Sequence, residues 1–354
     1  MFTLPRTRVF IADSEPTDVD LLMAILGADP EIEVMGVAAT GKQAIDLVAD
    51  LRPDIIIMSE FLKGLDCLEA IKQIMAYSPT PILVLTAPDG QHRDETIIKA
   101  ISMGALDVVE KPLSATETYQ RGGFKSSSLV EAVKLLSRIK VVTHLAGKIE
   151  RNRLTNNTNE EPIPTLQKPR KLVAIAASTG GPTALAEVLG RLPAGPAMGL
   201  VIVQHVAEGF SAGLADWLNK ESELVVREAQ DGEWIESGFA FIAPTGFQMS
   251  VKNGNQIKLE KGAPVSGHRP SADVLFMSVA EAYKTDSIGV ILTGMGSDGA
   301  NGVVAIKRAG GRTIAQDEQS CVVFGMPQAA IQKGMVDEVV PLESIAERIE
   351  KLCR

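Results

Sequence analysis

Residues 171–192, KLVAIAASTGGPTALAEVLGRL, decide the fold class of this chain. An apolar run ends at Ser178, two glycines follow, and Pro182 opens a stretch whose apolar residues recur at helical spacing. A buried strand, a glycine turn and a helix that begins at proline are typical of a βα unit. Because βα units place successive strands parallel, this stretch predicts a parallel sheet covered by helices.

The pattern continues to residue 316. GLVIVQ, LVVREAQ, SIGVILTG and RTIAQ are strand-like and are separated by helical stretches. Residues 239–262, FAFIAPTGFQMSVKNGNQIKLEKG, are rich in Gly and Asn and predict strands with a hairpin. We therefore predict that residues 171–354 form a doubly wound, mostly parallel α/β domain with a small antiparallel hairpin.

The same alternation occurs five times in residues 1–112, from RVFIAD to ALDVVEKP, and predicts a (βα)5 domain over residues 1–125. Residues 126–170 follow as a connector. Their first part has apolar residues at helical spacing, with Ser128 as a candidate N-cap, and their second part is polar and rich in proline. We expect a basic helix and then a linker.

Composition and charge restrict the function. The chain has 354 residues, 45% of them hydrophobic, three cysteines without a metal or disulfide pattern, and a net charge of −9. Residues 1–112 hold 9 basic and 18 acidic residues, whereas residues 113–170 hold 10 basic and 5 acidic ones. We expect a cytoplasmic protein without a membrane span, a metal or a nucleic-acid partner. The basic helix could bind nucleic acid or an anionic membrane, but we favour docking on the acidic first domain.

Three chemically active residues follow strands of the second domain. Ser178, His205 and Asp298 each come after a predicted parallel strand, and the carboxyl ends of such strands share one edge of the sheet. Singly, they could be part of an anion cradle, a structural histidine and a helix cap. Together they are the nucleophile, the general base and the acid that orients the base in a hydrolase.

A second interpretation comes from the loop at 294–299. GMGSDG satisfies G-x-G-x-x-G, follows a strand and precedes a helix, and Asp317 comes about 20 residues later, as in a dinucleotide site. The motif lies late in the domain, however, and Asp298 would place a negative charge against the pyrophosphate. An NAD-binding oxidoreductase is therefore the less favoured alternative.

Five ordered motifs carry a family resemblance. AIAASTGGPTAL, VIVQHVAEGFSAGLADWLN, HRPSADVLF, ILTGMGSDGANGV and QDEQSCVVFGMPQAA together closely resemble the chemotaxis protein-glutamate methylesterases. In that family a receiver domain, which has a flavodoxin-like fold, precedes the esterase domain, and the first domain here resembles it. The resemblance implies hydrolysis of glutamate γ-methyl esters on cytoplasmic chemoreceptor helices, and deamidation of glutamines, without a cofactor.

The resemblance also assigns roles. It implies that Ser178 is the nucleophile, His205 the base and Asp298 the orienting acid. The remaining implied site residues are the backbone groups of Met295 and Thr179 at the oxyanion hole, and Gly180, Gly181, Arg269 and Met326 along the substrate groove. Phe247 stands where many members have histidine, a change that concerns the groove and spares the triad.

The receiver-like domain departs from its family. Asp13, Thr86 and Lys111 match the phosphorylation site, but Ser59 occupies the position of the phosphoacceptor aspartate and Ala12 replaces the first of the two acids that bind Mg²⁺. A serine hydroxyl cannot form an acyl phosphate. We therefore predict a pseudo-receiver, and the alternative is a slipped register in which Glu60 or Asp66 substitutes.

The leading hypothesis is thus an active methylesterase with a regulatory domain that cannot be phosphorylated. Its expected partners are methylated chemoreceptor helices and, through the receiver-like domain, a chemotaxis histidine kinase or another signalling protein. The alternative from the binding class is a scaffold in which both domains have lost their chemistry.

Overall fold

The computed structural model describes residues 6–86, 93–112, 126–139, 141, 168–193, 198–206, 208–252 and 254–354. The chain divides into two compact units, residues 1–159 and 160–354, which we treat separately. Most of the predicted linker falls outside the described residues. No helix in the described part of the chain is long and apolar enough to cross a membrane.

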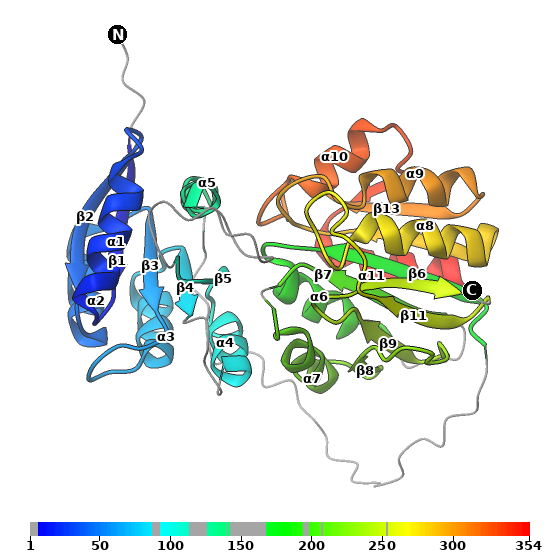
Figure 1. The fold of residues 1–354 in the computed structure, drawn as a ribbon, viewed down its shortest axis with the longest axis horizontal. Coiled ribbons are helices and arrows are strands. Elements are labelled where there is room, and N and C mark those ends of the chain that lie inside the picture. Colours follow the sequence, from blue (N-terminus) through cyan, green and yellow to red (C-terminus); the bar gives the residue numbers. More distant parts are fainter. Residues whose placement is uncertain are drawn as a thin grey trace, which may run out of the picture. The chain divides into compact units, whose positions relative to one another are not determined.

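The first unit is a five-stranded parallel sheet with helices on both faces (Figure 1). The strands are β1 (Thr7–Ala12), β2 (Ile32–Ala38), β3 (Ile55–Ser59), β4 (Ile82–Thr86) and β5 (Asp107–Glu110), in the order β2-β1-β3-β4-β5. The helices are α1 (Pro16–Gly27), α2 (Gly41–Leu51), α3 (Cys67–Tyr77), α4 (Arg93–Ser102) and α5 (Ser126–Leu136). This confirms the predicted (βα)5 fold, but its fifth helix is α5, which the sequence analysis placed in the connector after residue 125.

Local signals in the sequence fix the starts of these helices. Pro16 lies at the start of α1, where its missing N–H is not needed. The side chains of Thr40 and Asp66 cap α2 and α3 by accepting hydrogen bonds from the backbone N–H groups of Gln43 and Glu69, at 3.2 and 2.8 Å. Ser128 does not cap α5, because that helix begins two residues earlier.

The helix α5 packs on the acidic first unit. It contacts α1, and Leu129, Val133 and Leu136 are buried. Lys134 forms ion pairs with Asp29 and Glu31, at 2.7 and 2.6 Å. Part of the basic connector therefore docks on the first unit, as we favoured.

The second unit contains a seven-stranded sheet in which every pair is parallel, in the order β14-β13-β12-β6-β7-β9-β8. Its strands are β6 (Lys171–Ala177), β7 (Met198–Gln204), β8 (Val225–Glu228), β9 (Phe239–Ile242), β12 (Ser287–Ile291), β13 (Arg312–Gln316) and β14 (Glu338–Val340). A separate antiparallel hairpin consists of β10 (Gln248–Lys252) and β11 (Gln256–Glu260). The prediction of a mostly parallel sheet with a small hairpin is confirmed.

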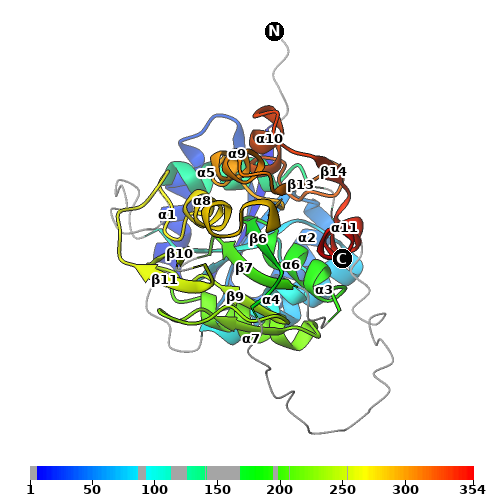
Figure 2. The ribbon, with the colours of Figure 1, turned by 90° about the vertical axis from the view of Figure 1, so that its right-hand side faces the viewer.

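Helices lie on both faces of this sheet (Figure 2), and an apolar core fills the space on each face. One contains residues of α6 (Gly181–Leu189), α7 (Ser211–Glu221) and α11 (Leu342–Cys353). The other contains residues of α8 (Ala272–Tyr283), α9 (Ala300–Arg308), α10 (Met326–Gln332) and the hairpin. A short 3₁₀ helix, Lys284–Asp286, leads from α8 into β12. The last strand predicted from the sequence is β13, and the structure shows that α10, β14 and α11 follow it.

Candidate active site

Two of the predicted residues follow neighbouring strands at the carboxyl edge of the sheet. Ser178 comes directly after β6 and His205 directly after β7, and these strands pair with Ala177 opposite Gln204. The backbone N–H of His205 donates to the carbonyl of Ala177 at 3.0 Å. The register therefore places Ser178 beside His205.

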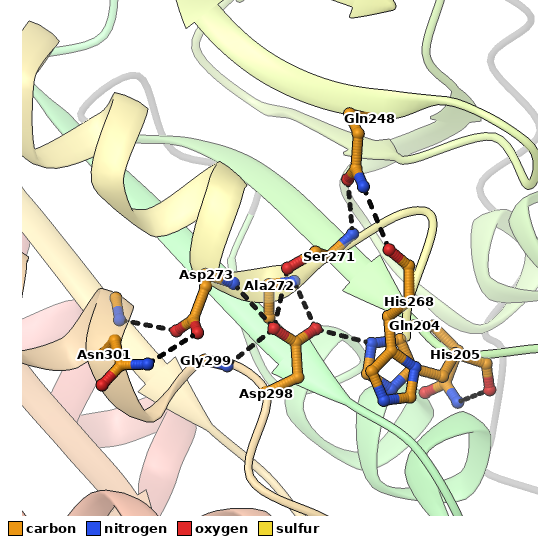
Figure 3. Close-up of polar contacts among 11 residues, drawn as sticks. Gln204, His205, Gln248, His268, Ser271, Ala272, Asp273, Asp298, Gly299 and Asn301 are labelled. Atoms are coloured by element: carbon orange, nitrogen blue, oxygen red, sulfur yellow. Dashed lines mark hydrogen bonds and ion pairs between the residues drawn. The ribbon is translucent and has the colours of Figure 1, made fainter. Parts of the chain in front are cut away.

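Asp298 reaches the same edge from the loop between β12 and α9. Its Oδ2 lies 2.9 Å from Nε2 of His205 (Figure 3). Its two carboxylate oxygens also accept hydrogen bonds from Ser271 Oγ and from the backbone N–H groups of Ala272, Asp273 and Gly299, at 2.6–3.1 Å. These donors fix the carboxylate in one orientation and favour its ionised form.

The environment of Asp298 keeps it charged. Burial alone would raise its pKa, but the hydrogen bond and charge of His205, together with the bonds from Ala272 and Ser271, lower the pKa to about 2. Because Asp298 stays ionised at neutral pH, it can stabilise an imidazolium at His205.

The hydrogen bond to Asp298 also selects the tautomer of His205. With the proton on Nε2, the other ring nitrogen, Nδ1, carries a lone pair. Nδ1 is buried and has no hydrogen-bond partner among the described residues. Within the same residues no hydrogen bond joins the Ser178 hydroxyl to His205, so the structure connects the predicted base and acid and places the serine beside them.

A second histidine, which the sequence analysis quoted in a motif without assigning it a role, supports the ring of His205. The rings of His205 and His268 are stacked, with centroids 3.9 Å apart and planes 5° apart. Burial and the charge of His205 lower the pKa of His268 to about 4, although Asp298 opposes this change. His268 is therefore neutral at pH 7 and presents a flat, uncharged face to the base.

Gln248 holds the segment that carries this histidine. Its Nε2 donates to the carbonyls of Ala263 and His268, and its Oε1 accepts from the backbone N–H of Ser271 at 2.8 Å. Ser271 in turn donates to Asp298 at 2.8 Å. The hairpin thus positions both His268 and the carboxylate, a role that residue type and spacing alone do not reveal.

The loop that contains GMGSDG is packed against the serine. A Cβ atom on Gly294 would lie 2.5 Å from Sδ of Met326 and 2.7 Å from Cβ of Ser178. Gly299 begins α9 with φ of +89°, a conformation that favours glycine. Protein atoms therefore occupy the space beside Gly294, and Asp298 is fully engaged with the histidine site, so these glycines serve the hydrolase arrangement rather than the dinucleotide alternative.

The other predicted groove residues have defined surroundings. A Cβ atom on Gly180 would meet Val322 at 2.5 Å, and one on Gly181 would run into the side chain of Gln204. The carbonyl of Thr179 accepts from Thr293 Oγ1 at 3.0 Å. Arg269 is exposed and donates to the carbonyl of Gly262 at 3.0 Å. The two glycines are thus required for packing, and the groove remains a prediction.

The receiver-like unit contains an ion-pair cluster at the carboxyl edge of its own sheet. Lys111 Nζ lies 2.7 Å from Asp13 Oδ2 and 2.6 Å from Asp18 Oδ2. Burial opposes the charge of Lys111, but the hydrogen bonds that it donates to both aspartates raise its pKa. Thr86 is fully buried, and its carbonyl accepts the backbone N–H of Lys111 at 2.8 Å.

The structure corrects one assignment in this unit. Ala12 is the last residue of β1 and is fully buried in the core, so the two residues after the strand are Asp13 and Ser14. Ser14, rather than Ala12, therefore stands where a second metal-binding acid would be. Ser14 Oγ donates to the carbonyl of Ala39 at 2.7 Å and accepts the backbone N–H of Lys63 at 2.8 Å, which connects three loops.

Ser59 lies where the sequence placed it. It ends β3, is 1% exposed and pairs in register with Leu85 of β4. The N–H of Glu60 continues this pairing by donating to the carbonyl of Leu85, and Asp66 caps α3. The register is therefore not slipped. No group of three or more His, Cys, Asp and Glu residues in the described part of the chain could hold a metal ion.

Comparison with known proteins agrees with this division. The family model for the CheB methylesterase matches residues 173–349, and the model for the response regulator receiver domain matches residues 9–121. The crystal structure of the Thermotoga maritima CheB methylesterase catalytic domain superposes with a TM-score of 0.51 and 41% identity, covering 52% of this chain and 100% of that one.

Full-length relatives share both units. Protein-glutamate methylesterase/protein-glutamine glutaminase 2 of Anaeromyxobacter dehalogenans is 41% identical over 347 residues, which span 98% of this chain and 97% of the relative. A protein of the same name, without the number, from Pyrococcus abyssi is 36% identical over 97% of this chain and 93% of the relative.

Proposed function

Because this chain belongs to the CheB methylesterase family, we propose that it hydrolyses glutamate γ-methyl esters on the cytoplasmic signalling helices of chemoreceptors, releasing methanol, and that it deamidates glutamines at such sites. The observation that carries the proposal is the hydrogen bond of 2.9 Å between His205 and Asp298 at the sheet edge where Ser178 lies. A scaffold without chemistry would have no use for an ionised carboxylate buried against a histidine.

In the proposed mechanism, Nδ1 of His205 accepts the proton of the Ser178 hydroxyl while the hydroxyl oxygen attacks the γ-carbonyl carbon of the substrate. The imidazolium then protonates the departing methoxide, which leaves as methanol, and a glutamyl ester of Ser178 remains. Water attacks this ester with His205 again as the base, and Ser178 recovers its proton. Asp298 stays ionised and stabilises the imidazolium in both steps.

Two features support the remaining roles. Gly294 packs against Ser178, and Met295 follows it in the chain. The backbone N–H of Met295 is therefore our candidate donor to the oxyanion, and the backbone of Thr179, directly after the serine, is the second candidate. The partly buried, neutral ring of His268 covers one face of His205 and limits the access of water to it.

Methanol release from methylated receptor membranes tests this proposal. The wild-type chain should release methanol, and Ser178→Ala should reduce the rate to the background without changing thermal unfolding. Equal rates in the two proteins would refute the esterase assignment. Ammonia release from receptors that carry glutamine at the same sites tests the deamidase activity.

We further propose that the receiver-like unit is not phosphorylated and responds to a protein partner, such as a chemotaxis histidine kinase that binds without transferring phosphate. Of the three positions that would supply carboxylates, two carry the hydroxyls of Ser14 and Ser59, and the third, Asp13, is paired with Lys111. Incubation with acetyl phosphate and Mg²⁺ should leave the mass of the chain unchanged. A base-labile gain of one phosphoryl group would contradict this proposal.

A further inference from the structure

Gln204 ends an apolar strand in the centre of the catalytic sheet. The strand β7 reads MGLVIVQ, all of it buried, and Gln204 itself is 1% exposed. A buried amide is costly unless its polar atoms find partners. Yet Oε1 of Gln204 is buried and has no hydrogen-bond partner among the described residues. Because Oε1 has no partner, a glutamine at this position is not explained by its polar atoms all being hydrogen-bonded.

The amide nitrogen of Gln204 has two partners, and both belong to the site. Nε2 donates to the carbonyl of Ser178 at 2.7 Å and to the carbonyl of His205 at 3.0 Å (Figure 3 shows the second bond). The carbonyl of Ser178 also accepts the N–H of Gly181 at 2.7 Å. One planar NH₂ group thus spans the ends of β6 and β7 and joins the backbone of the nucleophile to that of the base.

We infer that Gln204 is a positioning residue, which holds the Ser178 backbone at a fixed place relative to His205 so that the serine hydroxyl stays within reach of Nδ1. This inference rests on the proposed esterase function. It assigns to Gln204 no contact with the substrate or with the reacting atoms. Its effect is on the geometry of attack, and small displacements of a reacting group are expensive in rate.

The glycine at 181 supports the inference. A Cβ atom on Gly181 would collide with Oε1 of Gln204 and lie 2.8 Å from its Cδ. The turn after Ser178 therefore leaves the space that the amide occupies. A side chain at 181 would push the amide away from the two carbonyls while leaving its chemistry intact.

Gln204→Met tests the role, because methionine has nearly the same length and cannot donate a hydrogen bond. The matched control is Asn255→Leu. Asn255 is also buried and donates from its amide to a backbone carbonyl, that of Ile235 at 2.8 Å, but it bonds to no residue of the site. Both variants should unfold at a lower temperature than the wild type.

Two rates distinguish positioning from a loss of stability. One is methanol release, and the other is the phosphonylation of Ser178 by a fluorophosphonate probe, followed by mass spectrometry. Gln204→Met should lower kcat and the phosphonylation rate by about 10- to 100-fold and change KM by less than about threefold, whereas Asn255→Leu should keep both rates near those of the wild type.

A folded Gln204→Met protein with both rates within about twofold of the wild type would overturn the inference. So would an equal loss of rate in Asn255→Leu. If Gln204→Met does not fold, Gln204→Leu decides by the same two rates, since leucine also cannot donate a hydrogen bond to the two carbonyls. A wild-type chain that reacts with the probe but releases no methanol would refute the proposed substrate and leave the inference on Gln204 measurable.

Discussion

Asp298→Asn is the sharpest test of the site, because five donors converge on the two oxygens of Asp298. An asparagine retains one acceptor oxygen. If its NH₂ group replaces Oδ2, it faces His205 and the N–H of Ala272, and if it replaces Oδ1, it faces Ser271 Oγ and the N–H groups of Asp273 and Gly299. Every rotamer therefore sets donors against donors.

The expected effect on catalysis follows from the tautomer of His205. An NH₂ group opposite Nε2 favours the tautomer with the proton on Nδ1, which cannot accept the proton of Ser178. The same change in a Ser-His-Asp triad of a protease lowers kcat by about 10⁴, equivalent to about 5 kcal/mol in the barrier. We expect a loss of this order in methanol release.

The expected effect on stability depends on pH. The pKa of Asp298 is about 2 in the folded chain, against 3.8 for an ordinary aspartate, which corresponds to about 2 kcal/mol. Because the folded-state pKa is the lower one, this stabilisation is present above about pH 4 and is lost as the pH falls towards 2. The destabilisation by Asp298→Asn should therefore shrink in acid.

Urea unfolding followed by tryptophan fluorescence measures this difference, since both tryptophans, Trp217 and Trp234, lie in the second unit. The control is Asp286→Asn, which makes the same replacement at a half-exposed aspartate paired with Lys171. The reasoning is wrong if Asp298→Asn keeps more than about a tenth of kcat, or if its destabilisation does not depend on pH.

Three further predictions follow from the stacked histidine, the helix start and the receiver-like unit. The pKa of His268 falls from 6.5 to about 4 on folding, so the wild type should lose up to about 3 kcal/mol of stability as the pH drops from 6.5 to 4. His268→Phe should remove this loss in urea titrations and leave kcat within about threefold. Gly299→Ala places an alanine at φ of +89° and 3.2 Å from Cβ of Ala272, so it should cost about 1–2 kcal/mol by the same assay and lower kcat through Asp298. Calorimetric titration should show Mg²⁺ binding to the double variant Ser14→Asp/Ser59→Asp and none to Ser59→Asp, a contrast that would fail if Ala12 were the missing acid position.

The sequence predicted the fold because the relevant signals are local. Runs such as GLVIVQ and helix starts such as Pro182 specify strands and helices within a few residues, and parallel strands then place their ends on one edge. The association of Ser178, His205 and Asp298 with that edge needed no further information. The missing acid was assigned to Ala12 instead of Ser14, because the apolar run RVFIAD does not show that the strand ends at Ala12 and that the two residues after it are Asp13 and Ser14.

The surroundings of the site could not be predicted in the same way. The stacking of His268 on His205 and the bonds of Gln248 join segments separated by 15 or more residues, and a local pattern carries no information about such contacts. Gln204 was different, since a polar residue that closes an apolar strand is visible in the sequence.

The hydrogen bonds of Ser14 and the ion pairs of Lys111 have a consequence for the cell. Contacts within the chain engage Ser14, Asp13 and Lys111 at this edge of the sheet, and we propose that neither free Mg²⁺ nor a small phosphodonor acts there. On this proposal, a cell with many kinases would have an enzyme that does not exchange phosphoryl groups with any of them. Its output would then depend on a binding partner or on the amount of enzyme, and not on phosphoryl transfer.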